Sequence, residues 1–74
     1  MNKTRREKIK AIKETLNNIL SKLDQILDEE QDYYDNMPEN LQSSTRADTS
    51  QEAIDELNNA IESVNDAVDH LSNI

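Results

Sequence analysis

The chain contains no glycine and one proline, and this restricts its fold more than any other feature of the sequence. Glycine supplies the positive backbone φ of tight β-hairpin turns and of loops that hold phosphate groups. Its absence argues against β-meanders, P-loops and dinucleotide-binding folds. With 74 residues the chain is long enough for one small domain at most. The sequence therefore predicts a single all-α domain over residues 1–74.

Large apolar residues recur at steps of three and four along the first half of the chain, which is the spacing of a heptad repeat. With Ile9 lettered a, positions a and d hold Ile9, Ile12, Leu16, Ile19, Leu23, Ile26, Tyr33 and Met37, and position e holds Leu20, Leu27 and Tyr34. Three apolar columns are broader than the seam of a two-helix contact. We expect a helix over about 3–35 that contacts more than one neighbour.

The second half repeats the heptad more strictly. Positions a and d hold Ile54, Leu57, Ile61, Val64, Val68 and Leu71, and position g is alanine at 53, 60 and 67 before Ile74. Small side chains at g let another backbone approach closely. We expect this helix to contact both its hairpin partner and a second chain.

The segment between the two repeats contains Pro38, which disfavours a helical conformation at the preceding residue and starts a new turn. We place this turn at about 36–43 and the second helix at about 44–72. Ser43 or Ser44 would cap an early helix start, with a weak first turn over 48–50, whereas Thr49 with Glu52 forms a capping box for a later one. We favour the early start because Ala47 lies one heptad before Ile54.

A short turn between two long helices predicts an antiparallel αα-hairpin. One hairpin leaves much of each apolar column in contact with water, so we expect two copies to form an antiparallel four-helix bundle. The alternative is a hairpin that docks on a foreign helix or groove. The residues expected in the hairpin core or the dimer interface are Ile9, Ile12, Leu16, Ile19, Leu20, Leu23, Ile26, Leu27, Ile54, Leu57, Ile61, Val64, Val68 and Leu71.

Charge is segregated along the chain, whose net charge is -8. Residues 1–14 carry six basic and two acidic side chains, a balance of +4, and the other 60 carry two basic and 14 acidic, a balance of -12. One interpretation is solvated helix faces, with the basic start beside Asp66 and Asp69 at the end of the second helix. A second is an acidic surface that occupies a basic groove of a partner. A third, direct nucleic-acid binding by residues 3–13, lacks interleaved aromatic residues.

The sequence offers no set of catalytic or metal-binding residues. The chain has no cysteine and one histidine, His70, which the heptad places at a solvent-facing position with Asp66 one turn before it. Two ligands fall short of the three or four that a zinc site needs. The acidic run over 28–32 lacks the glycine of a calcium-binding loop. We therefore predict no enzyme activity, no metal and no cofactor.

Glu30 is an exception in the first repeat because it places a carboxylate at position a. Either the seam frays there and Glu30 reaches water, or Glu30 is a buried polar residue that fixes register, paired with Arg46 or with Lys22 of a second chain. Of the two tyrosines we expect Tyr33, at d, in the core. We expect Tyr34, at e, on a contact surface. The candidate partner-binding residues are Asp28, Glu29, Glu30, Asp32, Tyr34 and Asp35.

The stretch from Asp35 to Ser44, which reads D-N-M-P-E-N-L-Q-S-S, is followed by Arg46 and an Ala-Ile-x-x-Leu repeat. This pattern, over residues 24–74, resembles a group of small acidic helical proteins encoded by phages and prophages of Gram-positive bacteria. In that group Glu-rich heptads follow the motif, whereas this chain has Thr49 and Ser50 and often asparagine. The resemblance implies a genomic setting in which small proteins often bind host proteins, including antiviral defence components.

Together these features predict a cytoplasmic, non-enzymatic interaction protein in the bacterial host cytosol. It would be a phage-encoded inhibitor that binds a host defence or nucleic-acid-handling protein directly, with no membrane segment. The alternative function is a structural or regulatory dimeric coiled-coil accessory protein.

Overall fold

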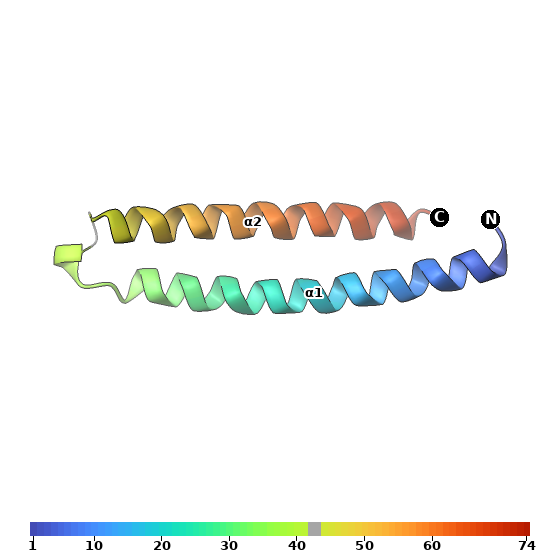
Figure 1. Ribbon diagram of the computed structural model, residues 1–74, viewed down its shortest axis with the longest axis horizontal. Helices are drawn as coiled ribbons and strands as arrows, with labels where there is room; N and C mark the ends of the chain where they lie inside the picture. Colours follow the sequence, from blue (N-terminus) through green and yellow to red (C-terminus); the bar gives the residue numbers. More distant parts are fainter. Residues whose placement is uncertain (42–43) are drawn as a thin grey trace.

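The computed structural model describes residues 1–41 and 44–74, and the secondary structure of this part of the chain consists of helices alone. Helix α1 spans Lys3–Asp35, a short 3₁₀ helix η1 spans Glu39–Leu41, and helix α2 spans Thr45–Ser72. The two long helices lie antiparallel, with both chain ends at the same end of the molecule (Figure 1). The predicted all-α helical hairpin is thereby confirmed.

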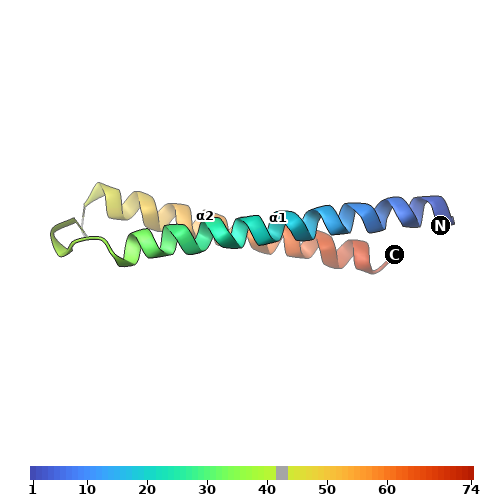
Figure 2. The same ribbon diagram turned by 90° about the horizontal axis from the view of Figure 1, so that it is seen from below.

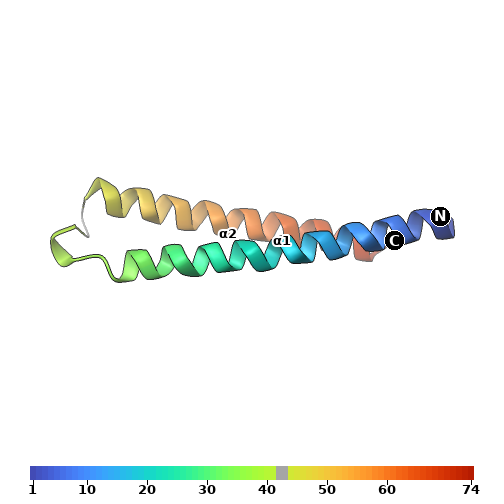
Figure 3. The same ribbon diagram turned by 60° about the horizontal axis from the view of Figure 1, so that its bottom comes forward.

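The hairpin is long and thin. Its extents are 59 × 15 × 12 Å, and its radius of gyration of 17.2 Å exceeds the roughly 11 Å of a compact chain of this length. Two further views show α1 and α2 crossing at a shallow angle along their shared length (Figures 2 and 3). A single layer of two helices leaves both outer sides of the hairpin open to solvent.

Helix α1 ends at Asp35 because Pro38 follows three residues later and the last carbonyls find local donors. The Asn36 backbone N–H donates to the Asp32 carbonyl over 3.0 Å, and the Asn36 side-chain amide donates to the same oxygen over 2.8 Å. The Leu41 N–H then donates to the Pro38 carbonyl over 2.8 Å and closes η1. The single proline and local caps make the turn without glycine.

Helix α2 begins at Thr45 with Ser44 as its N-cap. The Ser44 hydroxyl accepts from the Ala47 backbone N–H at 3.4 Å and donates to the Leu41 carbonyl. The helix therefore starts at the earlier of the two expected positions, and it is continuous through 48–50 where we expected a weak first turn. The other candidate cap, Ser43, and Gln42 of the motif lie outside the described residues.

The most buried side chains gather beside the turn. Of the described residues, Met37, Ala47, Ser50 and Ile54 are the ones that are buried. Farther along the hairpin, the residues between the helices are half-buried. The core is therefore strongest at the turn and weaker toward the chain ends.

The N-cap at Ser44 gives the first testable prediction. Ser44→Ala removes the acceptor for the Ala47 N–H and should lower the free energy of unfolding by about 1 kcal/mol, measured by urea titration at fixed protein concentration. Ser44→Asp restores the N-cap acceptor but not the donor to the Leu41 carbonyl, and should recover part of the stability. Ser63→Ala makes the same chemical change on the exposed surface of α2 and is the control. Equal effects of Ser44→Ala and Ser63→Ala would show that the cap contributes nothing.

Candidate interaction surfaces

The seam between the helices uses different columns on α1 and α2. On α2, positions a and d face α1, as predicted, and Leu57, Ile61, Val64, Val68 and Leu71 are half-buried there. On α1 the half-buried residues are those of positions a and e: Ile9, Lys13, Leu16, Leu20, Leu23, Leu27, Glu30 and Tyr34. Position d of α1 therefore lies outside the hairpin seam.

Periodicity could not choose between these two seams. Positions a and e alternate by four and three residues, as positions a and d do, so both sets form a continuous stripe on a helix. One neighbouring helix covers two adjacent columns and leaves the third uncovered. In the folded hairpin α2 covers the columns that contain the leucines, and the column of Ile12, Ile19 and Ile26 remains exposed.

The two tyrosines exchange their expected places for the same reason. Tyr33, expected in the core, is 48% exposed, whereas Tyr34, expected as a contact residue, is half-buried in the seam. Tyr33 continues the column of exposed isoleucines by one heptad. The aromatic ring that is available to a partner therefore belongs to Tyr33.

The uncovered columns of the two helices lie on the same side of the hairpin. A helix turns by about 100° per residue, which places position d of α1 and position g of α2 each about 80–90° around its helix from the centre of the seam, in the same rotational sense along the chain. Because the two helices are antiparallel and face each other, equal rotations bring both columns to the same side of the hairpin. We call this surface the apolar side face. It consists of the isoleucine column, Ile12, Ile19, Ile26 and Tyr33, and the alanine column, Ala53, Ala60, Ala67 and Ile74.

The apolar side face contains most of the large apolar side chains that the hairpin leaves exposed to solvent. The exposed large apolar residues are Met1 and five residues of this face: Ile12, Ile19, Ile26, Tyr33 and Ile74, each 40–54% exposed. Ala60 and Ala67 between them are also exposed. Soluble monomers rarely expose apolar patches above a few hundred Å², so a continuous double column of this length is typical of an interface.

The acidic candidates divide into two groups. Asp28, Glu29, Asp32 and Asp35 are exposed at the turn end of α1, and the Asp35 carboxylate accepts a hydrogen bond from Gln31 Nε2 over 3.0 Å. Glu30 and Tyr34 lie half-buried in the seam. The surface that a partner can reach at this end therefore contains the four exposed carboxylates.

Glu30 belongs to a polar layer inside the seam. Ile9 and Lys13 lie beside Leu71 at the open end of the hairpin, and counting inward by three heptads places Glu30 and Tyr34 beside Ser50. Ser50 is only 2% exposed, and its hydroxyl has no hydrogen-bond partner among the described residues. The Glu30–Arg46 ion pair, one of the two alternatives for Glu30, is absent from the described part of the chain, where the one ion pair joins Lys3 to Glu7.

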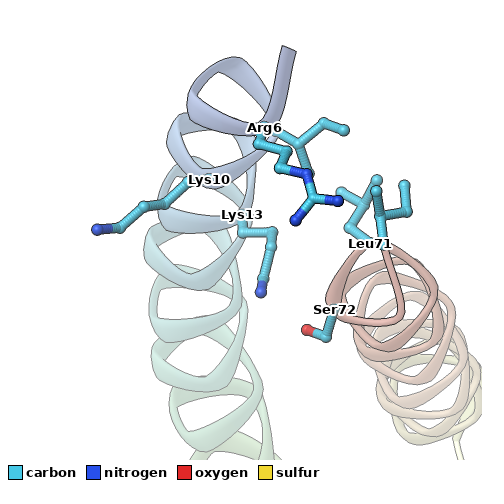
Figure 4. A pocket seen from close by; sticks show the side chains of 7 residues that line it. Arg6, Lys10, Lys13, Leu71 and Ser72 are labelled. Atoms are coloured by element: carbon cyan, nitrogen blue, oxygen red, sulfur yellow. The ribbon is translucent and has the colours of Figure 1, made fainter. Parts of the chain in front are cut away.

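The basic start of α1 forms a hollow with the end of α2 (Figure 4). The hollow has a volume of about 210 Å³ and is lined by Arg6, Ile9, Lys10, Lys13, Leu71, Ser72 and Ile74. In Figure 4 Arg6 and Lys13 extend from α1 toward α2, whereas Lys10 points away. The hollow is smaller than the roughly 300 Å³ at which small-molecule pockets begin, and Asp66 and Asp69, expected near the basic start, are not among its lining residues.

The charges of α1 oppose its own dipole. Its first turn contains basic and no acidic residues, and its last turn contains acidic and no basic ones, although helix dipoles favour the reverse order. The antiparallel arrangement brings the basic start beside the C-terminus of α2 and the acidic end beside its N-terminus (Figure 1). These charges therefore favour the hairpin pairing over an isolated α1.

The part of the chain that the structure describes contains no cluster of side chains suited to a metal ion. No group of three or more His, Cys, Asp or Glu side chains could hold a metal ion there. His70 is exposed in the last turn of α2. Neither α1 nor α2 contains an apolar stretch sufficient to cross a membrane.

No family model, no curated protein and no solved structure matches this chain. The surfaces of the hairpin, its apolar side face and its acidic turn end, are therefore the guide to function.

The polar layer at Ser50 gives the second prediction. Ser50→Ala removes a buried hydroxyl that has no partner and should raise the free energy of unfolding by about 1 kcal/mol or more, since such a group costs about 1–3 kcal/mol to bury. Urea titration of Ser50→Ala beside Ser63→Ala checks this, because both changes raise helix propensity equally and only the first removes a buried group. A gain at Ser50 no larger than at Ser63 would contradict the desolvation argument.

Proposed function

We propose that this protein is a non-enzymatic protein–protein interaction module. The observation that carries the proposal is the apolar side face, where Ile12, Ile19, Ile26, Tyr33 and Ile74 remain 40–54% exposed. Leaving such side chains in water costs free energy that binding another helix recovers, at about 25 cal/mol per Å² of apolar surface. A helical hairpin with this surface and no catalytic arrangement in its described part acts by contact.

The proposed action is direct inhibition of a host protein in the bacterial cytosol. The turn end of α1 presents Asp28, Glu29, Asp32 and Asp35 to solvent, and a surface of this charge complements a basic, nucleic-acid-binding groove. The resemblance to small phage proteins directs the choice of partner toward antiviral defence proteins and other proteins that handle nucleic acid. Binding through carboxylates on a rigid helix needs little rearrangement of the hairpin.

The second candidate function is a structural or regulatory dimeric coiled-coil accessory protein. The elongated shape, with a long axis of 59 Å, supports it, because a rod that pairs along its side separates the chains attached to it. A spacer of this kind should tolerate removal of residues 1–8, which lie mostly beyond the end of α2 (Figure 1). Loss of partner binding or of dimers after that truncation would argue against a simple spacer.

The acidic surface gives the third prediction. Reversing three exposed charges, in the variant Asp28→Lys/Glu29→Lys/Asp32→Lys, should weaken binding to the host protein by about 100-fold, because rim charge pairs contribute about 0.2–1 kcal/mol each and reversal converts attraction into repulsion. The measurement is affinity by calorimetry for a partner identified by pull-down from host lysate, together with plaque formation with and without the protein.

The matched control reverses three exposed acids of α2 away from the turn, in Glu62→Lys/Asp66→Lys/Asp69→Lys, and changes the net charge by the same amount. This control should bind with little change. Equal weakening by both variants would assign the effect to net charge alone. A lysate without a specific partner, combined with plaque counts that do not respond to the protein, would reject the inhibitor function.

A further inference from the structure

We infer that the apolar side face is occupied by a second copy of this chain, arranged so that α1 of each protomer lies over α2 of its partner and both turns lie at the same end. This inference rests on the proposed function and specifies its first partner and geometry. It differs from an unspecified four-helix bundle because it assigns the interface residues and the orientation. The evidence is the area, the side-chain sizes and the charge distribution of the face.

The area of the face suits a stable dimer. Two hairpins that pair along their whole length would share a rectangle of 59 × 15 Å, about 900 Å², compared with about 800 Å² per partner in a standard stable interface; the apolar side face occupies the part of this length over residues 12–33 and 53–74. Closed two-fold symmetry requires one self-complementary surface. The apolar side face meets this requirement because it contains one column of large and one column of small side chains.

The two columns are staggered along the hairpin. Ile9 and Lys13 lie beside Leu71, so Ile12 is level with the gap between Ala67 and Ile74. One heptad inward, Ile19 is level with the gap between Ala60 and Ala67. A further heptad places Ile26 level with the gap between Ala53 and Ala60. Ile19 and Ile26 thus lie at the height of gaps between alanines of α2.

A two-fold axis along the hairpin uses this stagger. Rotation about that axis keeps every residue at its own height and exchanges the two columns, so the isoleucine column of each protomer lies over the alanine column of its partner. Ile19 and Ile26 then each enter a gap between two alanines, and Ile12 enters the gap between Ala67 and Ile74, in the knobs-into-holes packing of helix bundles. The opposite orientation places isoleucine over isoleucine and alanine over alanine. The large isoleucines then hold the two α1 helices apart, whereas the small alanines contact each other only if the two α2 helices approach closely. One rigid hairpin does not meet both requirements.

The acidic side chains do not obstruct this arrangement. By helical position, only Glu29 of α1 and Glu56 of α2 border the apolar side face near the turn. Asp24, Asp28, Asp32 and Asp35 point to other sides of α1, and they are exposed. At physiological ionic strength, charges farther apart than about 8 Å are largely screened. The repulsion between the two acidic turn ends is therefore largely confined to Glu29 of one protomer and Glu56 of the other, which lie at the rim of the interface.

The first part of the test measures dimer dissociation by light scattering over a concentration series, with the full chain of 8.5 kDa. We expect a particle of twice this mass. Ile19→Lys places a charge in the face, and Ala60→Gln fills a gap of the alanine column. Each should weaken the dimer by about tenfold or more, as expected for overpacking or a buried charge.

Asn18→Lys and Asn59→Gln introduce the same two residues, lysine and glutamine, at exposed positions outside the face. Both should retain the dimer. Circular dichroism checks that each variant stays helical. If Ile19→Lys unfolds the chain, Ala60→Gln still tests the face, because glutamine is a good helix former. A monomer at all concentrations, or face variants that dimerise like their controls, would overturn the inference. A monomer that still binds the host protein through its acidic surface would overturn this inference and leave the proposed function intact.

The second part measures orientation. Because the chain has no cysteine, Glu39→Cys can carry a single spin label in η1 at the turn. With both turns at the same end, the distance between the two labels should lie below about 30 Å, which is two helix diameters with the label arms. The inverted dimer would give about 50 Å, because residue 39 lies some 16 positions, at about 1.5 Å each, from the middle of the isoleucine column.

Lys22→Cys, near the middle of the isoleucine column, should give a short distance in either orientation and serves as the control for dimer formation. A short distance from Lys22→Cys with about 50 Å from Glu39→Cys would overturn the proposed orientation.

Discussion

The structure depends on a contact between two helices that is narrower than the apolar surface it has to cover. Helix α1 carries three apolar columns, and α2 covers two of them, those at positions a and e. The isoleucine column stays outside the seam and joins the alanine column of α2 on one side of the hairpin. The uncovered apolar columns leave the two-helix layer with a small core, since only three apolar side chains of the described residues are buried.

Stability is distributed unevenly along the hairpin. The turn end combines the Ser44 cap with the buried side chains of Met37, Ala47 and Ile54. The same end also contains the polar layer, in which the Ser50 hydroxyl is buried without a partner among the described residues and Glu30 lies in the seam. A polar layer lowers stability and disfavours shifted registers that would bury the carboxylate among apolar residues. The turn end thus fixes how α1 and α2 align.

Charge and apolar surface are separated on this molecule. The exposed carboxylates of α1 lie mostly away from the apolar side face, so a second copy on that face would leave them open to solvent. One hairpin could then use its side for self-association and its turn end for a different partner. The basic start of α1 lies beside the end of α2 and complements the negative end of that helix dipole. The +4 and -12 segments therefore meet across the hairpin as well as along the chain.

The sequence by itself determined the two helices, their antiparallel connection and the seam of α2, because heptad spacing, Pro38 and a serine cap act locally. It also located the small side chains at position g. Only the tertiary structure decided which columns of α1 meet α2, because a/d and a/e stripes have the same period. That choice exposed Tyr33 and left Tyr34 and Glu30 half-buried in the seam. Which face of a helix is covered depends on the neighbour, and no single helix encodes its neighbour's position.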